Sequence, residues 1–217
     1  MSAAGDAPLV AVLDYGIGNL RSAQKALQKA GADARLTADP GLVAEAAGVV
    51  LPGVGAFGRC MEAVHERGLG DLAVSAAASG RPFLGICVGL QLLYDASEES
   101  PGVAGLGIVP GTVRLLPDGV KRPQMQWNRL HRVRPGNLLA GLGDDPWVYF
   151  VHSYAPEDPT HAVGTCEYGG TIVAAIEAGN VWGCQFHPEK SGSNGLRILR
   201  NFVAACTAAQ TPAGSRS

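Results

Sequence analysis

The chain has 217 residues, of which 47% are hydrophobic and 17% charged, and its formal net charge is −2. This length suits one globular domain, and the apolar content is high enough to bury a core, which excludes a disordered chain. The near-neutral charge offers no large basic surface, so we exclude nucleic acid and membrane as partners. No apolar run approaches the roughly 18 residues of a membrane span, and no signal-peptide pattern is present, so we expect a cytoplasmic protein.

Short apolar runs alternate with helical sequence in the first half of the chain. Leu9–Leu13 predicts a buried strand, and apolar residues spaced three and four apart predict a helix from Leu20 to Ala30. Two further strands are predicted at Gly48–Leu51 and Phe83–Ile86, each followed by helical sequence, from Phe57 and over Val88–Tyr94. Buried strands that alternate with helices indicate a mostly parallel sheet covered on both faces.

The second half is divided by turns rich in Gly and Pro, which favour antiparallel hairpins. A last helix is predicted from about Asn194, and the tail 207–217 is expected to be flexible. We therefore predict an α/β three-layer sandwich with a mostly parallel central sheet, helices on both faces and added antiparallel strands, as one domain over residues 8–206. The strands predicted in the second half are Ile108–Leu116, Arg129–Val133, Trp147–Val151, Ala162–Tyr168, Thr171–Glu177 and Val181–Phe186.

The five cysteines contain no C-x-x-C pair and are odd in number, a pattern typical of reduced thiols rather than of disulfides or a zinc site. We therefore expect neither a metal nor a cofactor. Four of these thiols are interpreted as small buried hydrophobic residues. They are Cys60, Cys166, Cys184 and Cys206.

Cys87 differs because it stands in Gly85-Ile86-Cys87-Val88-Gly89, the cysteine version of G-x-S-x-G, between a buried strand and an apolar helix. A sharp turn of this kind projects a nucleophile from the end of the sheet. The positive end of the following helix favours the thiolate, and the N–H of Val88 faces an oxyanion that forms beside the sulfur. The motif predicts a catalytic thiol.

His187 and Glu189 supply a candidate base and its orienting group. His187-Pro188-Glu189 follows an apolar strand, and side chains two apart in an extended segment lie on one side. Because Pro188 is expected to hold the segment extended, the carboxylate can orient the imidazole. Cys87, His187 and Glu189 are thus the predicted catalytic residues.

The segment Gly53-Val54-Gly55-Ala56-Phe57-Gly58 matches the dinucleotide motif G-x-G-x-x-G. It does not follow the first strand, however, and the next strand does not end in an acidic residue, so nucleotide binding is disfavoured. A tight turn is one alternative. We prefer a second alternative, in which the glycines let backbone N–H groups face an oxyanion.

These motifs together resemble a known family. Gly85-Ile86-Cys87-Val88-Gly89-Leu90-Gln91 and Phe186-His187-Pro188-Glu189 resemble the class I glutamine amidotransferases. Asp14-Tyr15-Gly16-Ile17-Gly18-Asn19, Pro52-Gly53-Val54-Gly55, Tyr149-Phe150-Val151-His152-Ser153-Tyr154 and His187-Pro188-Glu189-Lys190-Ser191 are similar to the glutaminase subunits of imidazole glycerol phosphate synthase. The resemblance covers residues 9–203.

The resemblance implies hydrolysis of glutamine to glutamate and ammonia by the three catalytic residues. It implies an oxyanion site made by backbone N–H groups of Val88, Gly53, Val54 and Gly55. It also implies that glutamine contacts Gln91, Glu99, Ser153 and Tyr154.

It further implies a heterodimer with a (β/α)₈ barrel cyclase of histidine biosynthesis. The cyclase uses the ammonia to make imidazole glycerol phosphate and aminoimidazole carboxamide ribotide. Asn19, Trp127, Tyr149 and Lys190 would face that partner. The chain departs from the family at Gln124 and Gln126, where histidine and glycine are usual.

Three alternatives remain open from the residues. The chain can be the glutaminase subunit of another synthase, such as that for pyridoxal phosphate. It can be a cysteine hydrolase acting on peptides or esters, or a non-catalytic regulatory subunit whose thiol is unused.

Overall fold

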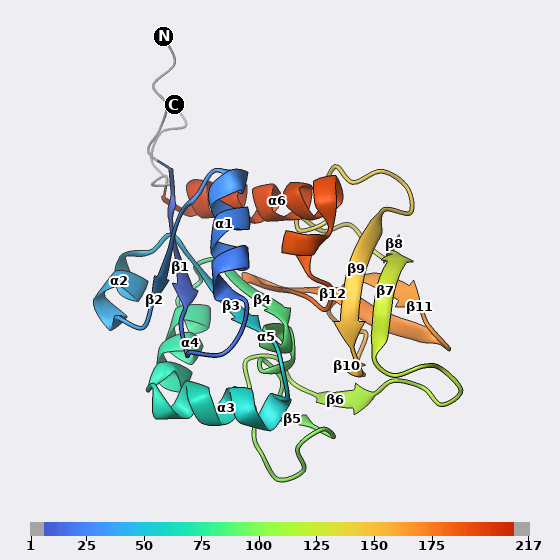
Figure 1. Ribbon diagram of the computed structural model, residues 1–217. Helices are drawn as coiled ribbons and strands as arrows, with labels where there is room; N and C mark the ends of the chain where they lie inside the picture. The colour runs from blue at the N-terminus through green and yellow to red at the C-terminus, as the bar shows by residue number, and fades with distance from the viewer. Residues whose placement is uncertain (1–6, 211–217) are drawn as a thin grey trace.

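The structure is a computed structural model that describes residues 7–210, and it has a central eight-stranded sheet in the order β2-β1-β3-β4-β13-β12-β11-β8 (Figure 1). Five neighbouring strands, β2 to β13 in that order, are parallel, and the strands from β13 to β8 are antiparallel. This arrangement confirms the predicted mostly parallel sheet with added antiparallel strands. The parallel strands are β1 (Leu9–Leu13), β2 (Asp33–Thr37), β3 (Gly48–Gly53), β4 (Phe83–Cys87) and β13 (Val181–Cys184).

Helices cover both faces of the sheet. In Figure 1, α1 and α6 lie above the central strands and pack against each other, whereas α3, α4 and α5 lie below. The sandwich is therefore three layers thick, as predicted. The helices are α1 (Leu20–Ala30), α2 (Pro40–Glu45), α3 (Phe57–Glu66), α4 (Leu69–Ala78), α5 (Val88–Gln91) and α6 (Gly192–Gln210).

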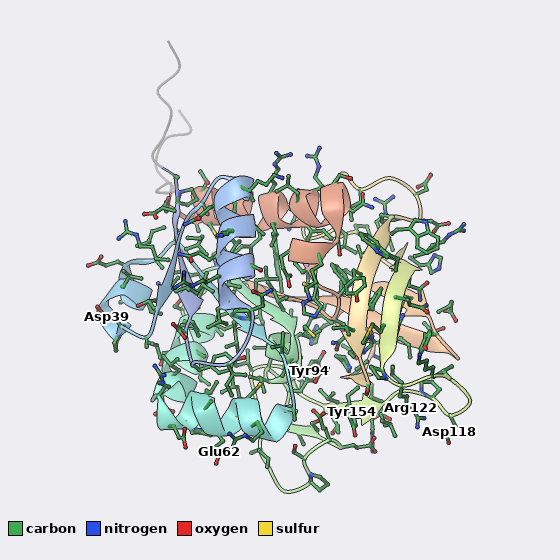
Figure 2. All side chains as sticks on the ribbon, viewed as in Figure 1. Asp39, Glu62, Tyr94, Asp118, Arg122 and Tyr154 are labelled. Carbon is green, nitrogen blue, oxygen red and sulfur yellow. The ribbon has the colours of Figure 1, made fainter. Side chains whose placement is uncertain are left out.

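Local sequence explains where the first helices begin and end. Helix α1 buries Leu20, Ala23 and Leu27, and it ends at Gly31, whose φ of 108° suits a residue without a Cβ. Helix α2 begins after Asp39, whose side chain accepts a hydrogen bond of 2.8 Å from the N–H of Gly41 (Figure 2).

The antiparallel strands divide among the central sheet and two small sheets. Strands β10, β6 and β5 form one small sheet, and β7 pairs with β9 in the other. The loop before β7 is fixed by Arg122, which pairs with Asp118 at 2.8 Å and donates to the carbonyl of Leu116 (Figure 2). These strands are β5 (Ala96–Ser97), β6 (Thr112–Leu115), β7 (Gln124–Arg129), β8 (His131–Arg132), β9 (Trp147–His152), β10 (Tyr154–Pro156), β11 (Ala162–Glu167) and β12 (Thr171–Ala178).

Several predicted bounds were wrong. The strand expected over Ile108–Leu116 is shorter, because Pro110 and Gly111, with a φ of 121°, precede its first residue, Thr112. The strand expected over Arg129–Val133 is split between the end of β7 and the short β8.

The carboxyl-terminal helix also differs from the prediction. Helix α6 buries Cys206 and continues through Gln210, four residues beyond the predicted end of the domain at residue 206. The remainder of that expected tail, 211–217, lies outside the described residues. No helix within residues 7–210 is both long enough and apolar enough to span a membrane.

Candidate active site

Cys87 lies at a sharp turn between β4 and α5. Its φ of 55° and ψ of −113° are unusual for a residue with a side chain, and backbone strain of this kind collects at functional sites. The glycines on either side make the turn possible. A Cβ atom at Gly85 would lie 2.8 Å from Cα of Leu90, and one at Gly89 would lie 1.8 Å from the carbonyl oxygen of Leu51.

Strand pairing brings the candidate base to this turn. β13 lies parallel to β4, with Cys184 opposite Ile86, although almost a hundred residues separate them in sequence. The residues that follow the two strands therefore leave the sheet at the same edge. The N–H of His187 also donates to the carbonyl of Tyr149 at 2.9 Å, which fixes its backbone to β9.

His187 and Glu189 are in contact, as predicted, but not for the reason given. His187 is extended, whereas Pro188–Lys190 form one turn of 3₁₀-helix with Pro188 at its start. This tight turn places Nδ1 of His187 2.7 Å from Oε1 of Glu189. The side chains are only 2% and 6% exposed, so the carboxylate orients the ring in a largely dry environment.

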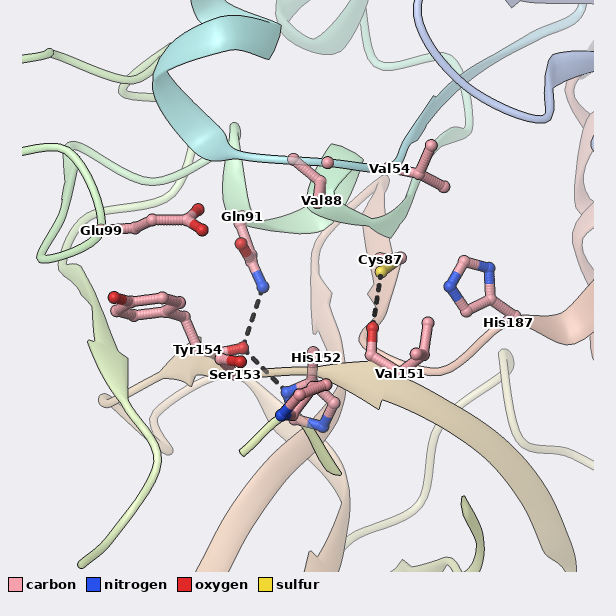
Figure 3. A pocket seen from close by; sticks show the side chains of 12 residues that line it. Val54, Cys87, Val88, Gln91, Glu99, Val151, His152, Ser153, Tyr154 and His187 are labelled. Carbon is pink, nitrogen blue, oxygen red and sulfur yellow. Dashed lines mark hydrogen bonds between the residues drawn. The ribbon is translucent and has the colours of Figure 1, made fainter. Parts of the chain in front are cut away.

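The imidazole is placed to exchange a proton with the thiol. Burial lowers the pKa of His187, but the neighbouring Cys87 and the carboxylate of Glu189 outweigh burial and raise the pKa above its ordinary value. Nε2 is the ring nitrogen that does not contact Glu189, and it has no hydrogen-bond partner in the described part of the chain. Figure 3 shows the ring beside Cys87 at the pocket wall.

A pocket of about 270 Å³ opens over the sulfur (Figure 3). Nine of the site residues predicted from the sequence line this pocket. The predicted residues Gly53 and Glu189 do not; they line a separate small cavity, which His187 also lines. The nine are Val54, Gly55, Cys87, Val88, Gln91, Glu99, Ser153, Tyr154 and His187.

Residues 11–206 match the family model described as glutamine amidotransferase class-I. The chain is 48% identical over 195 residues to the imidazole glycerol phosphate synthase subunit HisH of Moorella thermoacetica, covering 89% of this chain and 93% of that protein. It is 49% identical to the HisH subunits of Synechococcus elongatus, with 94% and 96% covered, and of Methanothermobacter thermautotrophicus, with 90% and 98% covered.

The chain belongs to the HisH family of class I glutamine amidotransferases. It is therefore a glutamine amidotransferase subunit, an enzyme with glutaminase activity.

Solved structures agree in fold with this HisH-family chain. PurLQS from Thermotoga maritima superposes with a TM-score of 0.72 at 20% identity, covering 91% of this chain and 98% of that one. A structure described as glutamine amidotransferase gives a TM-score of 0.69 at 20% identity, with the same shares covered.

The glycine-rich segment of this HisH-family chain lies at the pocket rather than in a dinucleotide site. Gly53 ends β3 opposite Cys87, and a Cβ there would lie 2.6 Å from the N–H nitrogen of Gly89. Tyr15 donates to the carbonyl of Pro52 at 2.7 Å, and the thiol of Cys60 contacts the carbonyl of Val54 at 3.3 Å. The turn is thus held on one side while Val54 and Gly55 line the pocket.

Two of the predicted glutamine contacts also have structural partners. One oxygen of Glu99 accepts a 2.7 Å hydrogen bond from the N–H of Phe57 at the start of α3. The amide nitrogen of Gln91 donates to the carbonyl of Tyr154 at 2.9 Å. Both side chains are therefore fixed before any ligand is bound.

Sequence reasoning missed three polar groups of the site. Gln185 is fully buried beside Cys87, the carbonyl of Val151 lies 3.9 Å from the sulfur, and His152 lines the pocket. Gln185 lies two residues before His187 in the chain. His152 is part of the motif Tyr149-Phe150-Val151-His152-Ser153-Tyr154. The sequence therefore offered a signal for each of these two side chains. What no sequence pattern shows is that these elements converge.

Three of the four predicted partner residues lie together on an exposed surface. The rings of Trp127 on β7 and Tyr149 on β9 meet edge to face at 6.0 Å, and Nζ of Lys190 lies 5.9 Å from the centroid of Tyr149. Met125 and Trp147 are 61% and 48% exposed on the same pair of strands. We call these five residues the aromatic strip. Exposed large apolar side chains that gather on one surface are typical of an interaction site.

The other residues near the predicted interface lie apart from the strip. Asn19 precedes α1 and lines the small cavity that also contacts His187 and Glu189. The unusual Gln126 is exposed on β7, and Gln124 is buried with its side-chain oxygen 3.0 Å from Nε2 of His152. Within residues 7–210 no cluster of His, Cys, Asp and Glu is suited to hold a metal ion.

Proposed function

We propose that this chain hydrolyses glutamine to glutamate and ammonia and passes the ammonia to a (β/α)₈ cyclase. The observation that carries the proposal is the strained Cys87 turn beside a buried histidine whose other ring nitrogen is held 2.7 Å from Glu189. A nucleophile, a base and an orienting carboxylate in this order are the parts that acyl transfer requires.

The chemistry follows from the positions of these groups. His187 takes the thiol proton, and the sulfur of Cys87 attacks the side-chain carbonyl carbon of glutamine. The imidazolium then gives its proton to the departing nitrogen, so the C–N bond breaks, ammonia leaves and a γ-glutamyl thioester remains. Water, deprotonated by His187, attacks the thioester, and the sulfur leaves as glutamate forms. Glu189 keeps the ring in the productive orientation throughout.

The negative oxygen formed in each step needs donors. Val88, the residue after Cys87, is the first residue of α5, and Val54 and Gly55 of the Gly53-Val54-Gly55 turn line the facing wall of the pocket. We assign these backbone groups to the oxyanion site. Glutamine is held by Gln91, Ser153 and Tyr154, with the carboxylate of Glu99 facing its ammonium group.

We propose the cyclase of imidazole glycerol phosphate synthase as the partner, because the relatives named above are subunits of that enzyme. Its products are imidazole glycerol phosphate and aminoimidazole carboxamide ribotide, in histidine biosynthesis. The aromatic strip and Asn19 supply the contact surface. Burial of this strip against a partner matches the enrichment of Trp, Tyr and Met at interfaces.

Glutamate release from glutamine tests the proposal. The purified chain is assayed alone and with the cyclase and its nucleotide ligand, using Cys87→Ala and the matched variant Cys206→Ala. We expect activation by partner and ligand, loss of activity in Cys87→Ala, and retention in Cys206→Ala, whose sulfur is buried in α6. Equal activity without the cyclase would reject the partner, and activity that survives Cys87→Ala would reject the nucleophile.

A further inference from the structure

Gln185 is fully buried between β13 and the catalytic histidine, and its side-chain amide contacts two groups of the site. Its oxygen accepts a hydrogen bond of 3.1 Å from Nε2 of Gln91. Its nitrogen donates toward the sulfur of Cys87 at 3.8 Å. One amide thus joins a glutamine-binding residue to the nucleophile.

The direction of this chain of hydrogen bonds is fixed by a backbone group. The carbonyl of Tyr154 can only accept, so the amide of Gln91 must present its NH₂ group to it. The second N–H of that group then faces Gln185, which must present its oxygen. The NH₂ of Gln185 is left to face the sulfur, and the reverse orientation would set two donors against each other.

We propose that Gln185 is a positioning residue for the nucleophile, one that holds the sulfur of Cys87 through an N–H donor oriented by Gln91. The inference rests on the proposed function, because it assigns Gln185 a part in the chemistry of Cys87. Gln185 touches the reacting sulfur but neither accepts nor gives up a proton.

A second contact of the sulfur explains what the donor does. The carbonyl of Val151 lies 3.9 Å from the sulfur and can only accept, so it favours the protonated thiol. The N–H of Gln185 can only donate, so it favours the thiolate. When His187 takes the proton, the contact with Val151 is lost and the contact with Gln185 strengthens.

Other titratable groups near the sulfur do not obscure the influence of the Gln185 N–H on the protonation of Cys87. Burial raises the pKa of Tyr15, of Cys60 and of Cys184, so these groups stay neutral at pH 7. His187, backed by Glu189, is the neighbour that exchanges a proton with the sulfur, and it is the same in all the variants below.

Alkylation of Cys87 by iodoacetamide between pH 5 and 10 tests the inference, with the modified cysteine identified by mass spectrometry. The variant is Gln185→Met, which keeps the length of the side chain but has no N–H. The matched control is Gln124→Met, the same change at a second fully buried glutamine, whose side-chain oxygen lies 3.0 Å from Nε2 of His152 and not beside Cys87.

We expect Gln185→Met to move the midpoint of the alkylation profile up by about one pH unit, which is roughly a tenfold slower reaction below the midpoint. Gln124→Met should leave the midpoint in place. If Gln185→Met does not fold, Gln185→Asn replaces it, because its shorter side chain withdraws the N–H and should shift the midpoint the same way.

Equal midpoints in the wild type and in a folded Gln185 variant would overturn the inference, as would an equal shift in Gln124→Met. Failure of the proposed function is distinguishable, because it would show as a wild-type chain that releases no glutamate with the cyclase and its ligand.

Discussion

Gly89 packs against the carbonyl oxygen of Leu51 so closely that a Cβ atom at Gly89 would lie 1.8 Å from it. This contact joins the first turn of α5 to β3, the strand that leads into the Gly53-Val54-Gly55 turn. It fixes Cys87 relative to the facing wall of the pocket.

Gly89→Ala should therefore lower the free energy of unfolding by about 3 kcal/mol or more, because backbone must move to relieve the overlap. Any folded fraction should have little activity, since the movement separates Val88 from the turn. Urea denaturation and glutamate release measure the two effects. Gly143→Ala is the control, because nothing lies within 4 Å of a Cβ there. Similar stability of the two variants would contradict the packing argument.

Glu99→Gln should separate the two roles assigned to Glu99. The amide oxygen can still accept from the N–H of Phe57, so the free energy of unfolding should change by less than about 1 kcal/mol. Loss of the negative charge should raise KM for glutamine about tenfold or more, because a charged hydrogen bond to the substrate ammonium is removed. Steady-state kinetics provide the measurement. The control is Glu62→Gln, a change at an exposed residue of the neighbouring α3 (Figure 2), which should leave KM unchanged. An unchanged KM in Glu99→Gln would show that Glu99 does not contact glutamine.

His152 should make stability depend on pH in mildly acidic solution. Burial lowers its pKa from 6.5 to about 4, outweighing its hydrogen bond to the carbonyl of Tyr154. The unfolded chain therefore binds a proton at His152 as the pH falls below about 6.5, while the folded chain does so only near pH 4. The stability contributed by the neutral ring is present above that window and is lost as the pH falls through it, by about 3 kcal/mol in total.

Urea denaturation at pH 7 and at pH 4.5 measures this dependence. His152→Asn keeps a donor for Tyr154 but does not titrate, so its stability should fall by about 2 kcal/mol less than that of the wild type between these pH values. Carboxylates that titrate at low pH are the same in both proteins and cancel. Parallel pH profiles would show that His152 is not the group responsible.

Trp127→Ala should weaken association with the cyclase. Trp127 is 46% exposed and packs edge to face on Tyr149, the arrangement of an aromatic anchor. Its loss should cost about 2 kcal/mol of binding free energy, roughly a 30-fold higher Kd, as measured by titration calorimetry. Val74→Ala removes an exposed apolar side chain from α4 and should not change Kd. Identical affinities for the two variants would place the interface elsewhere.

Elements whose causes are local could be predicted from the residues alone. A buried strand followed by Gly-x-Cys-x-Gly and an apolar helix predicted the Cys87 turn. The backbone conformation of that turn is set by its glycines, its cysteine and their immediate neighbours in sequence. The alternation of apolar runs and helical spacings likewise predicted β1, α1 and β3, since period and hydrophobicity decide burial within one segment.

Which of these segments meet depends on the pairing and packing of the whole fold. The parallel pairing of β13 with β4 brings His187 to Cys87, and the pairing of β7 with β9 assembles the aromatic strip; both join residues far apart in the chain. The fold also set the direction of the hydrogen bonds that run from the carbonyl of Tyr154 through Gln91 to Gln185. That direction depends on the Tyr154 carbonyl, which belongs to another strand. Hydrogen bonds and packing between distant segments depend on their relative placement, and that placement is a property of the whole core rather than of any local pattern.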